Sequence, residues 1–153
     1  MRIVVVEDEA PIREGMAKLL SKINPEYELV GKAADGEAGY QLIRELNPDL
    51  VIMDIRMPKM DGIAMMKKLR EENIKCKAII LSAYSEFQYA QKAIELKADS
   101  YLLKPIKIPE LKSALKQAER EISEDQGTEQ IFSVEKYYVG LYAWSGAPEF
   151  TIK

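Results

Sequence analysis

The segment 50–62 reads LVIMDIRMPKMDG and places four apolar residues directly before an aspartate, Asp54. A proline and an Asp-Gly pair follow, which is typical of a strand that leads into a turn. An uninterrupted apolar run of this kind indicates a strand buried on both faces, as in a parallel sheet. Because burying an unpaired carboxylate is costly, either Asp54 only caps a turn or a functional site is built around it.

The chain up to about residue 123 alternates between short apolar runs and stretches with helical periodicity. This alternation predicts an α/β fold, with a parallel sheet covered by helices on both faces. A doubly wound five-stranded sheet in the flavodoxin-like order 2-1-3-4-5 suits the pattern and places a site at the carboxyl ends of the first and third strands. The expected strands cover 2–6, 27–35, 49–54, 77–83 and 98–104, and the expected helices lie within 7–23, 36–47, 62–73, 85–97 and 108–122.

Acidic residues close two strands that this order makes neighbours. Glu7 and Asp8 follow the first strand, and Asp54 ends the third. We expect the three carboxylates to share one pocket, where each raises the pKa of the others. A divalent cation relieves this repulsion, and Mg²⁺ prefers oxygen ligands with phosphate as a co-ligand. The chain has no histidine, and we see no P-loop, so the pocket indicates Mg²⁺-dependent phosphoryl chemistry.

Asp54 can act as a nucleophile in this pocket, since an aspartate that attacks phosphorus gives an aspartyl-phosphate. Phosphoryl transfer depends mainly on positioning and on neutralising the equatorial oxygens. Ser82 and Lys104 end the fourth and fifth predicted strands at the same edge and can supply a hydroxyl and a cation. Each residue alone is more typical of a turn or a cap. Their joint occurrence at the carboxyl ends of the strands favours a site.

Composition excludes several other functions. The 153 residues carry a net charge of −3, one cysteine and no histidine, which excludes Ser-His-Asp and Cys-His catalysis and any His-ligated metal. The charge balance does not predict a nucleic-acid-binding face. Cys76 alone suggests a reducing compartment. The apolar run 3–6 is too short for a signal peptide, and no segment is long enough to span a membrane, so we expect a cytoplasmic protein with no membrane partner.

Four motifs resemble, in order and spacing, those of the receiver domain of two-component response regulators. They are VVEDE at 5–9, DIRMPKMDG at 54–62, LSAY at 81–84 and DSYLLKP at 99–105. The resemblance covers residues 1–122, and the combination is very specific. It implies a signalling switch and not an enzyme, with self-phosphorylation and self-dephosphorylation as its only chemistry.

The resemblance also implies roles for the residues of the acidic pocket. Asp54 would accept a phosphoryl group from a phosphohistidine on a partner sensor histidine kinase. Glu7, Asp8 and Asp54 would hold Mg²⁺, with the main-chain carbonyl of Arg56 as a further ligand. Lys104 would pair with the phosphoryl oxygens.

A route for the signal out of the pocket is implied as well. The Ser82 hydroxyl would move to meet the phosphoryl group, and Tyr101 would rotate into the space left behind. This change would bias the face formed by the fourth helix, the fifth strand and the fifth helix, and so control homodimerisation or a transcriptional output. The family also leads us to expect a cis peptide bond between Lys104 and Pro105.

Two positions depart from the family pattern. Lys97 stands where receivers usually have glycine. If it adopts a left-handed cap conformation, the lysine costs on the order of 1 kcal/mol. Ser82 stands where threonine is also common, so the hydroxyl is kept and the methyl group is not.

The pattern of strands and helices fails beyond residue 123. We therefore predict a receiver domain at 1–123, followed at 124–153 by a linker and an aromatic C-terminal tail. Residues 81–106 most resemble receivers fused to AraC-type helix-turn-helix domains. The chain would then be part of a longer transcription regulator that contacts DNA only through an output domain not present here. A single-domain receiver with an added terminal element is the alternative.

Three other functions compete with the switch. An aspartate-nucleophile phosphatase would resemble DxDxT, but Arg56 stands two residues after Asp54 in place of the general acid. A flavodoxin-type binder would need a hydroxyl- and glycine-rich loop after the first strand, whereas 7–13 reads EDEAPIR and would repel phosphate. A pseudo-receiver would bind a partner without phosphorylation, through the same face or the aromatic tail; the complete set of acidic, hydroxyl and lysine residues argues against it.

Overall fold

The computed structural model describes residues 1–83 and 87–131 of the chain. The chain divides into two units, Met1–Ala118 and Glu119–Lys153. The strands are β1 (Arg2–Val6), β2 (Glu28–Ala33), β3 (Leu50–Asp54), β4 (Lys77–Ser82) and β5 (Ser100–Leu103), and the helices are α1 (Ala10–Ile23), α2 (Gly36–Leu46), α3 (Gly62–Glu71), α4 (Phe87–Glu95) and α5 (Ile108–Ile131).

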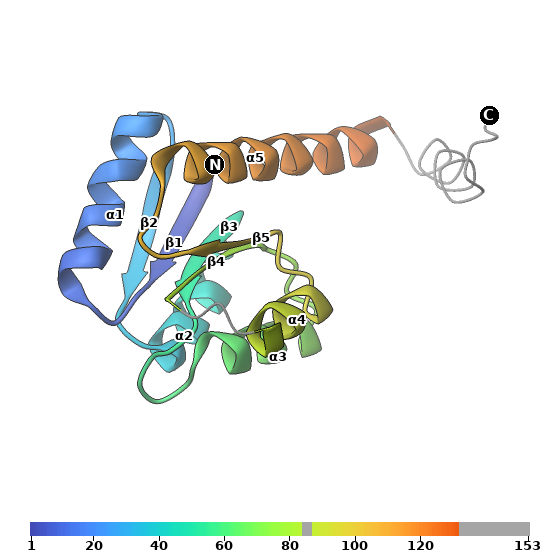
Figure 1. Cartoon of the computed structure of the whole chain (residues 1–153). Helices are drawn as coiled ribbons and strands as arrows, with labels where there is room; N and C mark the ends of the chain where they lie inside the picture. Colours follow the sequence, from blue (N-terminus) through green and yellow to red (C-terminus); the bar gives the residue numbers. More distant parts are fainter. Residues whose placement is uncertain (84–86, 132–153) are drawn as a thin grey trace. The chain divides into compact units, whose positions relative to one another are not determined.

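The strands form one sheet in the order β2-β1-β3-β4-β5, and their pairings are parallel (Figure 1). This confirms the predicted α/β class and strand order. The central strand, β3, is buried along its whole length, as its uninterrupted apolar run predicts. Asp54 is the last residue of this strand.

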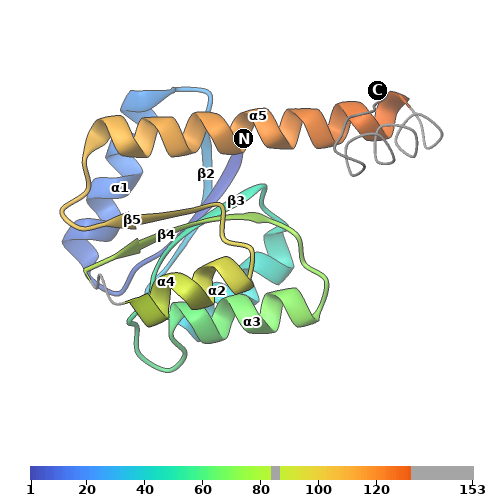
Figure 2. The same cartoon turned by 45° about the vertical axis from the view of Figure 1, so that its right-hand side comes forward.

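Helices cover both faces of the sheet (Figures 1 and 2). The central strand contributes residues to the apolar layers on both faces. Val51 and Met53 of β3 belong to the cluster that packs on the α2, α3 and α4 side. Leu50 and Ile52 face the other way, toward α1 and the first part of α5. Because side chains alternate across a strand, a strand buried on both faces needs an apolar residue at every position. The run before Asp54 meets this requirement.

Strand register brings the functional ends of the strands to one edge of the sheet. Val6 pairs with Met53, so the residues after β1 lie beside Asp54. Asp54 pairs with Leu81, and Ser82 pairs with Leu103, the residue before Lys104. The edge therefore collects the carboxyl ends of β1, β3, β4 and β5, which is where a doubly wound sheet places its site.

The last helix differs from the prediction. We expected it to end at residue 122 and the polar stretch SEDQGTEQ, 123–130, to be a linker, whereas α5 continues to Ile131. The physical reason is that Glu and Gln are good helix formers, so polarity alone does not end a helix. The aromatic tail from residue 132 onward lies outside the described residues, so its predicted role stays a prediction.

Arg70 of α3 ties together three segments through main-chain carbonyls. Its guanidinium donates to the carbonyls of Leu96 and Lys97 after α4, at 2.9 and 3.3 Å, and to those of Ile74 and Cys76 before β4, at 2.9 and 3.0 Å. The planar guanidinium carries donors in several directions, so one side chain can satisfy all four acceptors. Arg70 thus fixes the carboxyl end of α4 relative to the sheet.

Replacing Arg70 by alanine is expected to lower the free energy of unfolding by about 2 kcal/mol, because part-buried carbonyls lose charged donors. Urea unfolding followed by circular dichroism measures this change. Arg70→Lys should recover only part of the loss, since one ammonium cannot reach four carbonyls. Lys67→Ala on the exposed side of the same helix is the matched control. Equal effects at positions 67 and 70 would contradict the role given to Arg70.

Lys97 lies two residues after the end of α4 and has the left-handed conformation, with φ 62°. The main-chain N–H of Lys97 donates to the carbonyl of Ile94 at 3.0 Å, and that of Ala98 donates to the carbonyl of Ala93 at 2.9 Å. These two bonds form a Schellman motif, whose left-handed position favours glycine. The strain expected from the sequence at this departure is therefore present in the structure.

Lys97→Gly is expected to raise the free energy of unfolding by about 0.5–1 kcal/mol, because glycine adopts this conformation without a steric penalty. Thermal or urea unfolding measures the gain. Lys112→Gly, at an exposed position inside α5, is the matched control and should destabilise by about 1 kcal/mol. If Lys97→Gly also lowered the free energy of unfolding, the left-handed conformation of Lys97 would not be a source of strain, and the prediction would be wrong.

Candidate functional site

Three carboxylates meet at the carboxyl edge of the sheet. Ligand oxygens of Glu7, Asp8 and Asp54 all lie within 4.8 Å of one another. Glu7 is 3% exposed and Asp54 is 8% exposed, whereas Asp8 faces solvent. The structure therefore brings together the three acidic residues that the sequence places at adjacent strand ends.

Lys104 supplies a positive charge to this cluster. Its ammonium donates to Glu7 Oε1 at 3.0 Å and to Asp54 Oδ2 at 3.1 Å. Its main-chain N–H donates to the carbonyl of Ser82 at 2.8 Å, so the end of β5 is fixed to the end of β4. The peptide bond between Lys104 and Pro105 is cis, as expected from the family pattern. One lysine thus contacts the carboxylate that follows β1 and the carboxylate that ends β3.

Burial and charge act in opposite directions in the cluster. Burial raises the pKa of Glu7 and outweighs the hydrogen bond from Lys104, which lowers it; the nearby charge of Asp54 adds to the rise. Burial alone would lower the pKa of Lys104, but its hydrogen bonds to Glu7 and Asp54 and their charges together raise it. Lys104 therefore stays protonated. Its one positive charge only partly offsets the negative charges of the carboxylates, so a further cation would stabilise the cluster.

The segment after Asp54 is held closely against the start of α3. The Ile55 N–H donates to Asp54 Oδ1 at 2.7 Å, and the Gly62 N–H donates to the Ile55 carbonyl at 2.6 Å. A Cβ at position 62 would lie 2.3 Å from the main-chain oxygen of Asp54, so only glycine fits. Asp61 caps α3 by accepting from the Ala64 N–H at 2.7 Å. The Asp-Gly pair at 61–62 therefore lets the start of α3 pack directly against the main chain of Asp54.

Arg13 of α1 supports the loop that carries the other two acids. Its guanidinium donates to the main-chain carbonyl of Glu7 at 2.7 Å and lies 3.5 Å from that of Asp8. The Glu9 N–H donates to Glu7 Oε2 at 3.2 Å. We did not find Arg13 from the sequence, because its contacts are to main-chain atoms and leave no motif. It orients the loop and does not enter the cluster of carboxylates.

Ser82 and Tyr101 lie in the strands beside the cluster. Ser82, the last residue of β4, is fully buried. Tyr101 of β5 is half-buried and packs against the core on the α2, α3 and α4 side. Tyr101 pairs with Ile80 across β4 and β5, two residues before Ser82. The serine and the tyrosine therefore occupy adjacent strands that both lead to the edge with Lys104.

Arg56 extends from the loop after β3 to α4. Its guanidinium donates to the Tyr89 hydroxyl at 2.7 Å and lies 5.6 Å from the centroid of the Tyr89 ring. Nothing in the sequence indicates this contact, because the two residues lie 33 positions apart and share no motif. The side chain of Arg56 thus lies against α4, and the ligand role predicted for its main-chain carbonyl stays a prediction.

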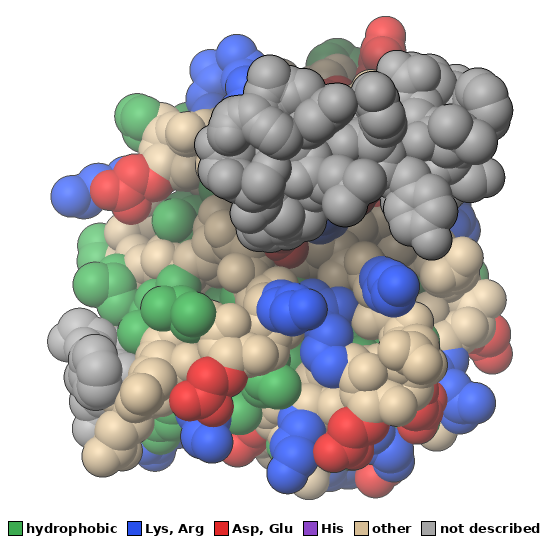
Figure 3. Space-filling view, turned by 90° about the vertical axis from the view of Figure 1, so that its right-hand side faces the viewer, with side chains coloured by type: hydrophobic (Ala, Val, Ile, Leu, Met, Phe, Trp, Pro, Cys, Tyr) green, Lys and Arg blue, Asp and Glu red, His purple; other side chains and the backbone are tan. Residues whose placement is uncertain are grey.

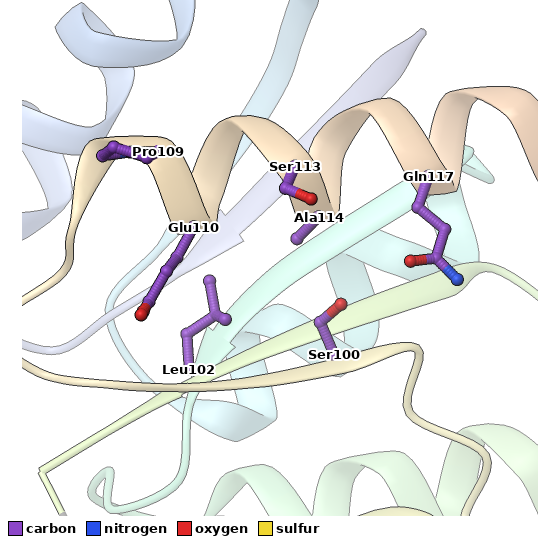
Figure 4. Close-up of a pocket in the computed structure, with 7 residues that line it drawn as sticks. All are labelled: Ser100, Leu102, Pro109, Glu110, Ser113, Ala114 and Gln117. Atoms are coloured by element: carbon purple, nitrogen blue, oxygen red, sulfur yellow. The ribbon is translucent and has the colours of Figure 1, made fainter.

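A hollow of about 390 Å³ lies between β5 and α5, away from the acidic cluster (Figure 4). Ser100 and Leu102 point from the strand toward the helix, and Glu110 and Gln117 extend from the helix toward the strand. None of the carboxylates of the cluster lines it. The residues that line the hollow come from β5 and α5.

The surface shown in Figure 3 mixes basic and acidic side chains with small hydrophobic groups. Such a mixture differs from the basic face that nucleic-acid binding favours. None of the helices in the described part of the chain has the length and hydropathy required to cross a membrane.

The doubly wound sheet, with three carboxylates and a lysine at the carboxyl ends of its strands, places the chain among α/β proteins whose site lies at that edge. The chain belongs to the response regulator receiver domain family, whose model matches residues 3–116. Receiver domains generally bind Mg²⁺, interact with histidine kinases and act in signalling and not as classical enzymes. The family resemblance seen in the sequence is thereby confirmed.

The curated relatives include proteins named as response regulators and one from Bacillus subtilis named as the transcriptional regulatory protein YdfI. The chain is 34% identical over 116 residues to the nitrate/nitrite response regulator protein NarL of Escherichia coli, covering 76% of this chain and 53% of the relative. It is 37% identical over 120 residues to the positive alginate biosynthesis regulatory protein of Pseudomonas aeruginosa, covering 78% and 48%. The chain spans about half the length of these curated relatives.

Solved structures give the same result. The receiver domain of AraT, a response regulator from Geobacillus stearothermophilus, is 35% identical and superposes with a TM-score of 0.73 over 82% of this chain and 97% of that one. The receiver domain of a NarL response regulator from Mycobacterium tuberculosis is 33% identical, with a TM-score of 0.71 over 77% and 95%. These likenesses confirm the fold as that of flavodoxin-like receivers.

Proposed function

We propose that this chain is a phosphoryl-accepting switch in which Asp54 receives a phosphoryl group from a phosphohistidine of a partner sensor histidine kinase. The observation that carries the proposal is the position of Lys104, whose ammonium contacts both Asp54 and Glu7 within one acidic cluster. In the transfer, an Asp54 carboxylate oxygen forms a bond to phosphorus and the phosphorus–nitrogen bond breaks. The imidazole leaves and keeps the bonding electron pair, which then takes a proton.

Lys104 and the main-chain N–H of Ile55 both donate hydrogen bonds to the carboxylate of Asp54. The lysine holds one carboxylate oxygen and the Ile55 N–H holds the other, so the acceptor is fixed before the donor arrives. Preorganised charges of this kind stabilise the developing charge on the transferring group. The complete set of groups favours a phosphorylated switch over a pseudo-receiver.

The donor set of the cluster fits Mg²⁺. Three carboxylates share the edge, and two of them are buried, so their mutual repulsion is a cost that a hard divalent cation relieves. Glu7, Asp8 and Asp54 would hold the ion, with the main-chain carbonyl of Arg56 as a further ligand. When bound, the ion neutralises the charge on the phosphoryl oxygens.

The signal is proposed to leave through Ser82 and Tyr101. The buried Ser82 hydroxyl would turn toward the phosphoryl group, and the half-buried Tyr101 ring would fill the space beside it. The face of α4, β5 and α5 exposes three large apolar side chains: Ile94 (75%), Leu103 (46%) and Ile108 (49%). This face is the proposed dimerisation surface. DNA would be contacted only through an output domain of a longer, cytoplasmic transcription regulator.

The proposal is tested by incubating the chain with acetyl phosphate, with and without Mg²⁺, and recording its intact mass and oligomeric state. We expect a phosphoryl adduct only with Mg²⁺, accompanied by a gain of dimer. A folded protein that forms no adduct would favour the pseudo-receiver. Turnover of small phosphate esters would favour a phosphatase.

A further inference from the structure

The contact between Arg56 and Tyr89 joins the acceptor segment to the switch face. Arg56 follows Asp54 by two residues, and Tyr89 lies in the first part of α4, the helix after Ser82. The guanidinium makes a 2.7 Å hydrogen bond to the Tyr89 hydroxyl and lies 5.6 Å from the ring centroid. Both interactions place the positive charge of Arg56 on α4.

The Tyr89 hydroxyl is a weak partner for the guanidinium. A phenol hydroxyl is a neutral acceptor, whereas a phosphoryl group is an anion with several strong acceptor oxygens. The bond from the guanidinium to the phenol has one charged member, whereas a bond from the guanidinium to a phosphoryl oxygen has two and gains their mutual attraction. Arginine also matches phosphate in geometry, because its planar donors can bind two oxygens at once. A phosphoryl group on Asp54 can therefore compete with Tyr89 for the same guanidinium.

We propose that Tyr89 is a positioning residue that holds the Arg56 guanidinium on α4 while Asp54 is unmodified. When Asp54 carries a phosphoryl group, the guanidinium exchanges the Tyr89 hydroxyl for phosphoryl oxygens. The contact with Tyr89 is lost on modification, so Tyr89 stabilises the unmodified state relative to the modified one. The exchange also removes the link between Arg56 and α4. The inference rests on the proposed function of Asp54. It involves an exchange of hydrogen bonds and no further covalent step.

Linkage gives the expected effect. A contact present only in the unmodified state lowers the affinity for anything that mimics the phosphoryl group, and removing the contact raises it. The probe is beryllofluoride with Mg²⁺, titrated by calorimetry. Tyr89→Phe should tighten the Kd about two- to fivefold by removing one hydrogen bond. Tyr89→Leu, which also removes the aromatic ring, should tighten it about tenfold.

Two control variants separate this role from a structural one. In an Arg56→Met background, which keeps the main-chain carbonyl, Tyr89→Phe should leave the Kd unchanged. Tyr40→Phe removes a different tyrosine hydroxyl, one that donates to Glu72, and should leave the Kd as in the native chain. Thermal unfolding of each variant checks that it is folded.

Equal Kd values for the native chain and Tyr89→Phe would overturn the inference, as would the same shift in the Arg56→Met background. Such results would leave the proposed function standing, because beryllofluoride would still bind. A native chain that binds no beryllofluoride in the presence of Mg²⁺ would overturn the proposed function and, with it, the inference.

Discussion

Asp54→Ala is expected to abolish the Mg²⁺-dependent phosphoryl adduct, which intact mass after incubation with acetyl phosphate measures. The reason is that the carboxylate bound by Lys104 and by the Ile55 N–H is the proposed nucleophile. The variant should fold, because Lys104 keeps its contact with Glu7 at 3.0 Å. Thermal unfolding verifies this.

The matched control for this variant is Asp61→Asn in the same loop. Asp61 caps α3 through its side-chain oxygen, and asparagine caps helices equally well. The control should form the adduct to the native extent. An adduct that persists in Asp54→Ala would place the acceptor elsewhere, and loss in both variants would show only that the loop is sensitive to change.

Lys104→Met is expected to lower the free energy of unfolding by about 3 kcal/mol in the absence of divalent cations, because it leaves two buried carboxylates without their counter-charge. Glu7 and Asp54 are the two carboxylates, at 3.0 and 3.1 Å from the ammonium. Urea unfolding in a chelator measures the loss. Lys107→Met, at an exposed position nearby, should change stability by about 0.5 kcal/mol or less.

The loss in Lys104→Met should depend on pH with a defined sign. Burial raises the pKa of Glu7 above its usual value of 4.5, so the folded state binds this proton more tightly than the unfolded state. Stability is then lost as the pH rises through the folded pKa. Lys104 lowers the pKa of Glu7 by its hydrogen bond and its charge. Removing the lysine therefore raises that pKa further, so the variant goes on losing stability up to a higher pH than the native chain. The difference between variant and native chain should shrink as the pH falls toward 4.5; a constant difference would contradict this account.

Much of the fold follows from local patterns in the sequence. The uninterrupted apolar run that ends at Asp54 required a strand buried on both faces, and the alternation of strands and helices restricted the sheet to a few orders. The order in turn placed Glu7, Asp8 and Asp54 together, which the structure shows. These inferences succeed because they depend on side-chain periodicity and on where parallel strands end.

Other features depend on tertiary contacts that leave no local pattern. Arg13 binds main-chain carbonyls and Arg56 binds a tyrosine 33 residues away, and neither pairing has a sequence motif. The end of α5 was predicted too early because polarity was taken as a sign of a linker, although polar residues extend helices well. Lys97 is an intermediate case. The family pattern suggested a left-handed residue at this position, but only the structure shows that the lysine adopts this conformation.

The central claim is that Asp54 carries the phosphoryl group, and borohydride reduction tests it most directly. The chain is phosphorylated with acetyl phosphate and Mg²⁺, reduced, digested and sequenced by mass spectrometry, because borohydride converts an aspartyl-phosphate to homoserine. We predict homoserine at position 54 and none in a sample prepared without Mg²⁺. Reduction at Asp8 or at another carboxylate, or no reduction in a folded protein that has formed the adduct, would contradict the account.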